Sequence, residues 1–151
     1  MPLTNFPKGV SGALPVSVTT ATVTLNKDDH ANRAIVLDRA AGITATLPAA
    51  TGTGNSYRFF VKTTFTGNGI IKVANATDVM TGFATLHQDA ADTVATFDTA
   101  ATSDTITMNG TTTGGLLGSQ VELVDLATGL WGVAVHTSAT GVEATPFSAT
   151  V

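Results

Sequence analysis

Apolar side chains recur at every second position in short runs along this chain, and this alternation restricts the fold more than any other feature. Tyr57, Phe59 and Val61 form one such run, and Trp131 and Val133 belong to another. A period of two residues is that of a β-strand with one buried face, whereas an amphipathic helix has an apolar stripe of period 3.6. No stretch shows a sustained helical stripe. We therefore predict an all-β protein, a β-sandwich or jelly roll of about ten short strands with extended N-terminal and C-terminal arms.

Two pairs of these runs are separated by turn signals and predict hairpins. Residues 57–61 and 71–73 flank Thr-Gly-Asn-Gly at 66–69, and residues 121–126 and 130–135 flank Ala-Thr-Gly at 127–129. Gly and Asn tolerate the positive φ angles that tight turns require. Near Thr20 the apolar residues change from even to odd positions, which predicts a break or a bulge there.

The predicted strands form one domain between two less regular ends. Residues 1–15 contain three prolines and read as an extended N-terminal arm, residues 16–137 as a single β-domain, and residues 138–151 as a C-terminal tail that forms a second arm. No repeat of fixed period is visible, which argues against a solenoid.

The charges are few and unevenly distributed. Only 12% of the residues are charged, about half of the usual share, and roughly one residue in five is threonine. Thr favours strands and keeps their exposed faces polar without charge, which suits packing beside other subunits. Residues 1–72 carry all seven basic and three acidic side chains, and residues 73–151 carry eight acidic ones. Arg58, Lys62 and Lys72 fall within the first predicted hairpin, which has no acidic residue of its own.

The sequence contains no motif for catalysis, a cofactor or a metal. There is no cysteine, and His30, His87 and His136 lie far apart in the chain. The glycine-rich segments match neither the dinucleotide nor the phosphate-loop spacing. The net charge of −4 without a dense basic patch disfavours nucleic acid. We therefore expect neither enzymatic activity nor a cofactor.

Two further features bear on location. No run approaches the roughly 20 apolar residues of a membrane span. The first residues lack the basic and apolar stretches of a signal peptide. We expect no membrane partner, and assembly in a cytoplasm.

Three segments resemble structural proteins of tailed bacteriophages. They are residues 5–10 (Asn-Phe-Pro-Lys-Gly-Val), residues 47–54, and residues 114–118 followed by a strand, a turn and Leu-Trp-Gly-Val at 130–133. The resemblance is to head decoration, or cement, proteins. It implies a β-rich homotrimer on the outer capsid surface of the virion, which binds the major capsid protein at capsomer junctions and stabilises the shell.

The arm and the nearby cations are the predicted capsid-binding residues. They are Leu3, Phe6, Lys8, Arg58, Lys62 and Lys72. The alternative is a phage fibre or receptor-binding β module. Such a module should display aromatic side chains for host sugars, yet aromatic residues are only 6% of the chain and most fall at predicted core positions. Binding to a glycan array would favour this alternative.

Overall fold

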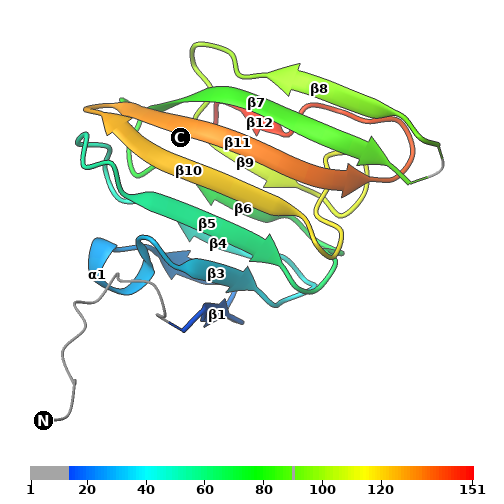
Figure 1. Cartoon of the computed structure of the whole chain (residues 1–151), viewed down its shortest axis with the longest axis horizontal. Coiled ribbons are helices and arrows are strands. Elements are labelled where there is room, and N and C mark those ends of the chain that lie inside the picture. The colour runs from blue at the N-terminus through cyan, green and yellow to red at the C-terminus, as the bar shows by residue number, and fades with distance from the viewer. Residues whose placement is uncertain (1–13, 90) are drawn as a thin grey trace, which may run out of the picture.

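The chain folds into two mixed β-sheets that pack face to face, as the computed structural model of residues 14–89 and 91–151 shows (Figure 1). Strands make up 48% of the protein and helix only 3%, which confirms the predicted all-β sandwich. The seven-stranded sheet contains, in spatial order, β1 (Val16–Val18), β3 (Ala34–Leu37), β5 (Ser56–Val61), β10 (Gln120–Ala127), β11 (Leu130–Ala139), β7 (Val79–Gln88) and β8 (Val94–Asp98). The five-stranded sheet contains β12 (Phe147–Ser148), β9 (Thr105–Met108), β6 (Gly69–Lys72), β4 (Thr44–Thr46) and β2 (Thr22–Thr24).

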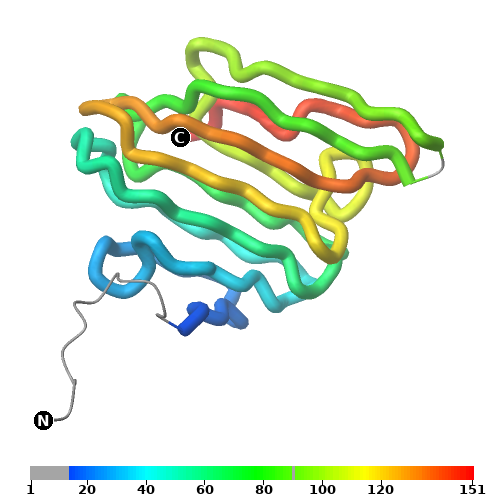
Figure 2. The backbone as a smooth tube through the Cα atoms, in the orientation of Figure 1, coloured from blue at the N-terminus to red at the C-terminus, as the bar shows by residue number. Residues whose placement is uncertain are grey.

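The first six strands alternate between the two sheets and wind as three coils, which Figure 2 follows from blue to green. Strands β1, β3 and β5 pair in parallel in one sheet, and β2, β4 and β6 pair in parallel in the other. The change of parity near Thr20 is therefore confirmed as a break, where the chain crosses from β1 to β2. This winding is locally solenoid-like, but it involves only the first six of the twelve strands, and the whole is the predicted sandwich. Val16 pairs with Ile35 and Ile35 with Phe59, so successive coils differ in length and leave no fixed period in the sequence.

The hairpin predicted for residues 57–73 is wrong, because β5 and β6 lie in different sheets. The glycines that suggested a turn instead allow close packing, Gly67 against the neighbouring coil and Gly69 against the ring of Phe65. A Cβ atom on Gly67 would lie 2.4 Å from the carbonyl oxygen of Ala41, and one on Gly69 would lie 2.1 Å from the Phe65 ring. No side chain fits at either distance, so glycine is required here by packing.

The second predicted hairpin is confirmed. Strands β10 and β11 pair antiparallel up to Ala127 and Leu130, and Gly129 takes the expected positive φ of 76°. A register shift at Leu126 adds a bulge beside the turn. This hairpin lies between β5 and β7, so it joins the coiled part of the seven-stranded sheet to β7 and β8.

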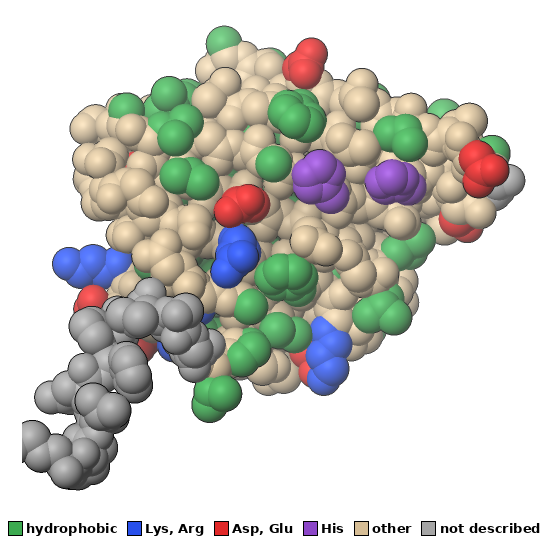
Figure 3. Space-filling view, viewed as in Figure 1, with side chains coloured by type: hydrophobic (Ala, Val, Ile, Leu, Met, Phe, Trp, Pro, Cys, Tyr) green, Lys and Arg blue, Asp and Glu red, His purple; other side chains and the backbone are tan. Residues whose placement is uncertain are grey.

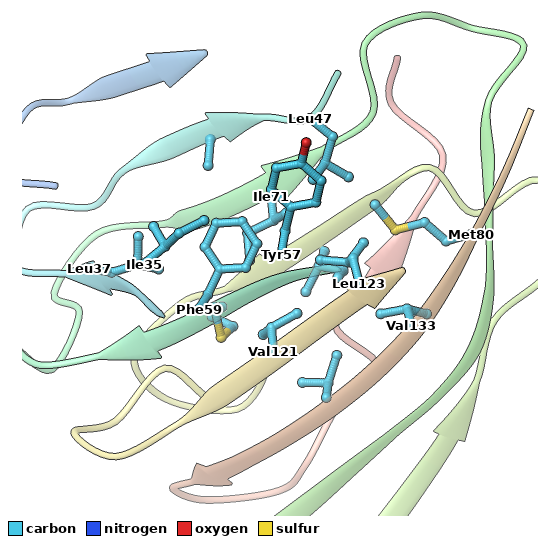
Figure 4. Packing of buried hydrophobic residues seen from close by; sticks show 14 of the residues in the cluster. Ile35, Leu37, Leu47, Tyr57, Phe59, Ile71, Met80, Val121, Leu123 and Val133 are labelled. Carbon is cyan, nitrogen blue, oxygen red and sulfur yellow. The ribbon is translucent and has the colours of Figure 1, made fainter. Parts of the chain in front are cut away.

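The inward-facing side chains of both sheets form one continuous core (Figure 4). Phe59 and Leu123 project from the seven-stranded sheet, Ile71 projects from the five-stranded sheet, and all three are at most 1% exposed. The alternation of apolar residues in the sequence supplies this core directly, since successive side chains of a strand point to opposite faces.

The two chain ends differ from one another. The C-terminal segment does not extend from the domain as an arm: β11 continues to Ala139, β12 pairs with β9, and Phe147 is only 8% exposed. The buried Asp104 carboxylate also accepts hydrogen bonds from the backbone N–H groups of Thr150 and Val151. The predicted N-terminal arm lies outside the described residues up to position 13.

A single helical turn interrupts the strands. Helix α1 (Lys27–His30) begins after Asn26, whose side chain accepts a hydrogen bond from the backbone N–H of Asp29. Across the described residues, no helix has the length and hydropathy needed to span a bilayer.

Candidate functional site

The outer face of the seven-stranded sheet is not covered by any other described strand or helix. This sheet faces the viewer in Figure 1, and no described strand or helix crosses in front of its central strands. The face is open because helices, which cover sheets in α/β proteins, are absent here apart from α1. It is therefore a candidate interaction surface.

Apolar and charged side chains are mixed on this face (Figure 3). Strand register places Arg58 directly opposite Glu122, and continues the same row through Ala134 to Phe83. Phe83 is 49% exposed, and Leu126 at the end of β10 is 53% exposed. Opposite charges on facing strands attract one another, so the middle of the face is close to neutral while its apolar groups remain accessible.

Two histidines lie side by side on the same face (Figure 3). His136 of β11 and His87 of β7 line a shallow depression of about 200 Å³. Gln120 of the neighbouring strand β10 pairs with His136. Among the described residues no group of three His, Asp or Glu side chains could hold a metal ion.

The predicted capsid-binding cations do not form one patch. Arg58 occupies an outward position of β5, and Lys62 is the residue that follows this strand. Lys72 lies on β6 in the opposite sheet. Lys62 also has an acidic partner, since its Nζ lies 2.7 Å from Oδ2 of Asp38. The hydrogen bonds from Lys62 and Thr63 hold the pKa of Asp38 below its ordinary value. The hairpin segment has no acidic residue of its own, but the fold supplies one from Asp38.

Leu3, Phe6 and Lys8 lie outside the described residues. The chain enters the described structure at Leu14, which is 78% exposed. Its carbonyl oxygen accepts hydrogen bonds from Nε and Nη2 of Arg33, with the Nε distance 3.0 Å. Strand β1 follows at the edge of the seven-stranded sheet, two strands from β5, the strand of Arg58. The predicted arm thus joins the fold on the sheet that carries Arg58.

A second candidate site lies at one end of the sandwich, where Asp125 holds the loop that precedes β5. The buried Asp125 carboxylate accepts hydrogen bonds from the backbone N–H groups of Thr51, Gly52 and Thr53, and from the Thr53 hydroxyl. Burial opposes the charged form of Asp125, but the bonds from these three residues outweigh it and keep its pKa below the ordinary value. The loop is therefore fixed to β10.

This loop forms one wall of a pocket of about 220 Å³. Tyr57 and Trp131 line its inner end, and Asn26, Lys27 and Ala49 belong to its other walls. Sequence reasoning missed this site because its residues come from four separate segments. The only advance signal was Trp131, the single tryptophan of the chain.

Comparisons of the chain with protein-family models, with curated proteins and with solved structures found no match.

Proposed function

We propose that this protein is a structural component of a phage virion that decorates the outer surface of the capsid. In this proposal it binds the major capsid protein at capsomer junctions, as a homotrimer, and thereby stabilises the shell. The observation that carries the proposal is the open face of the seven-stranded sheet, together with the start of the described chain at Leu14, beside the edge strand β1 of that same sheet. The resemblance of three sequence segments to head decoration proteins supports the same function.

The open face has the size and composition of a protein-binding surface. Seven strands at the usual spacing of about 4.8 Å and about six residues in length give an area of roughly 600 Å². Each partner in a standard protein interface buries about 800 Å², so this face can supply most of the required area. Aromatic residues and arginine are enriched in such interfaces, and here Phe83 and Arg58 share one row across the sheet.

Low charge density also favours docking onto a shell. A protein with few charges has few ions to desolvate on binding, and unpaired desolvated ions are costly. A ligand that binds only the assembled state shifts the equilibrium toward that state. Many copies of this domain would therefore make capsid disassembly less favourable.

Within this proposal, the contact with the shell involves the arm residues Leu3, Phe6 and Lys8 and the cations Arg58 and Lys62. These two cations lie on the sheet that the arm joins. Lys72 lies on the other sheet, so it can contact the same capsid surface only if the sandwich stands on its edge. Substitutions of these cations therefore distinguish docking by the open face from docking by an edge.

The test is co-sedimentation of the purified protein with empty heads assembled from the major capsid protein of the same phage genome. Deletion of residues 2–14 should abolish co-sedimentation while the β-sheet circular dichroism spectrum is retained. Arg58→Ala should weaken binding several-fold, whereas the matched control Lys72→Ala should leave it unchanged. Equal binding by the full-length and deleted proteins would refute the role of the arm. Absence of binding by the full-length protein would refute the function.

A further inference from the structure

The pocket at the end of the sandwich is lined by a residue with an unpaired buried polar atom. Trp131 is fully buried, and its indole Nε1 has no hydrogen-bond acceptor among the described residues. Tyr57 lines the same pocket and is 1% exposed, so its hydroxyl is a second polar group there. Nearly all buried polar atoms in proteins are hydrogen-bonded, so the unpaired Nε1 of Trp131 requires an explanation.

These two groups are held in fixed positions. The Tyr57 and Trp131 rings pack edge to face, with centroids 5.7 Å apart and an interplanar angle of 74°. In Figure 4 the Tyr57 hydroxyl points away from Phe59 and toward Leu47, the residue that precedes the loop wall of the pocket. Neither ring can therefore turn to find another partner without disturbing the core.

The chemistry of the pocket selects a neutral ligand with oxygen acceptors. The indole N–H can only donate, and a phenol can both donate and accept. The oxygens of Asp125 are already engaged by four donors from residues 51–53, so they are not free to bind a cation. Burial, with the nearby negative charge of Asp125 as a smaller cause, raises the pKa of Tyr57, so the phenol keeps its proton and can donate a hydrogen bond.

The size and the walls of the pocket narrow the ligand class further. Its volume of about 220 Å³ is below the roughly 300–1,000 Å³ of pockets for drug-sized molecules, so it can hold only a small ring. Leu25, Pro48 and Ala49 supply apolar wall, whereas Asn55 supplies an amide group. The amide of Asn26 is already bonded to Asp29. A ring with one apolar face and several hydroxyl groups matches both kinds of wall.

We propose that this end pocket binds a single neutral sugar ring, such as the terminal residue of a glycan, with the sugar oxygens accepting hydrogen bonds from Trp131 Nε1 and the Tyr57 hydroxyl. Sugar binding here is independent of capsid binding, since the pocket lies at the end of the sandwich and uses neither Arg58 nor Lys62. This proposal gives the protein two different contacts, one with a carbohydrate and one with the shell.

The single tryptophan makes the test direct. In a ¹⁵N-labelled sample the indole N–H of Trp131 gives one resonance, which can be followed during titration with glucose, galactose, N-acetylglucosamine and rhamnose, and with glycerol as a small polyol control. We expect at least one sugar to shift this resonance downfield along a saturating curve, and glycerol to leave it unchanged. No shift with any sugar would overturn the proposal.

Variants separate binding in the pocket from binding elsewhere. Tyr57→Phe removes only the hydroxyl and should weaken binding about three- to tenfold, as expected for one lost hydrogen bond. Ala49→Arg places a long side chain at an exposed position of the wall and should block binding. Gln120→Ala, on the open face, should not change the affinity. Equal sugar affinity in the Ala49→Arg variant would place the ligand elsewhere and refute the assignment, whatever the outcome of capsid co-sedimentation.

Discussion

Replacing Asp125 by asparagine tests whether its carboxylate fixes the loop at residues 51–53. The substitution keeps the size of the side chain but replaces one acceptor oxygen by an NH₂ group. The Oδ2 atom of Asp125 accepts from the Thr53 backbone N–H at 3.0 Å and from the Thr53 hydroxyl at 2.7 Å. An amide nitrogen in that position would face the Thr53 N–H as a second donor, so this bond is lost and a part-buried donor loses its partner.

The expected loss of stability follows from these contacts. A hydrogen bond to a charged group contributes about 1.5–3 kcal/mol, and the two bonds to Oδ1 from Thr51 and Gly52 weaken when the charge is removed. The lost bond from Thr53 and the two weakened bonds together cost about 3 kcal/mol of stability. For a domain of this length, each 1 kcal/mol lowers the melting temperature by about 2–4 °C, so Asp125→Asn should melt roughly 6–12 °C below the parent protein.

Thermal unfolding followed by circular dichroism, together with urea denaturation, measures this effect. The matched control is Asp98→Asn, an exposed aspartate at the end of β8, which should change stability by less than about 0.5 kcal/mol. If Asp125→Asn unfolds at the same temperature as Asp98→Asn, the carboxylate does not fix the loop and the reasoning is refuted.

Two further predictions concern pH and backbone packing. Asp125 and Asp104 have pKa values below the ordinary one because hydrogen bonds outweigh the effect of burial. The stability that these two carboxylates give the fold is complete above their unfolded pKa of about 4. It is lost as the pH falls through their folded pKa values. Urea midpoints should therefore fall below about pH 4, and the fall should be smaller in the double variant Asp104→Asn/Asp125→Asn; an unchanged acid dependence would contradict this. Gly82 has a φ of 149°, and a Cβ there would lie 1.9 Å from the Val133 carbonyl oxygen. Gly82→Ala should therefore cost more than about 2 kcal/mol in urea denaturation, whereas Gly54→Ala, with positive φ but open space around it, should cost about 1 kcal/mol; equal losses would show that the contact with Val133 is unimportant.

The fold class could be predicted from the sequence because the apolar alternation records which face of each strand is buried. It located the hairpin of β10 and β11, where Gly129 at the turn and the strand pattern agree. The same reasoning failed at Gly67 and Gly69, since glycine permits both tight turns and close approach of backbones. Only the position of Ala41 and Phe65 in space decides between the two roles.

The candidate sites were less predictable than the fold. Charge counting along the chain grouped Lys72 with Arg58, but the crossing between β5 and β6 sends these residues to opposite sheets. The end pocket depends on contacts between residues as distant in sequence as Thr53 and Asp125. No local pattern encodes such a contact, because the spacing of residues in a sequence does not report which loops meet at the end of a sandwich.

The hairpin of β10 and β11 has a consequence for the order of folding. During synthesis, the coils of β1 to β6 and the pair of β7 and β8 can form before Gln120 has been made, because their pairings are complete without it. The seven-stranded sheet is then two separate pieces, with β5 and β7 as unpaired edges. Unpaired edges recruit strands from other chains. The hairpin of β10 and β11 therefore protects against aggregation, because it pairs with both of these edges within the same chain. Nascent chains that stall before residue 120 lack this hairpin and should associate with one another.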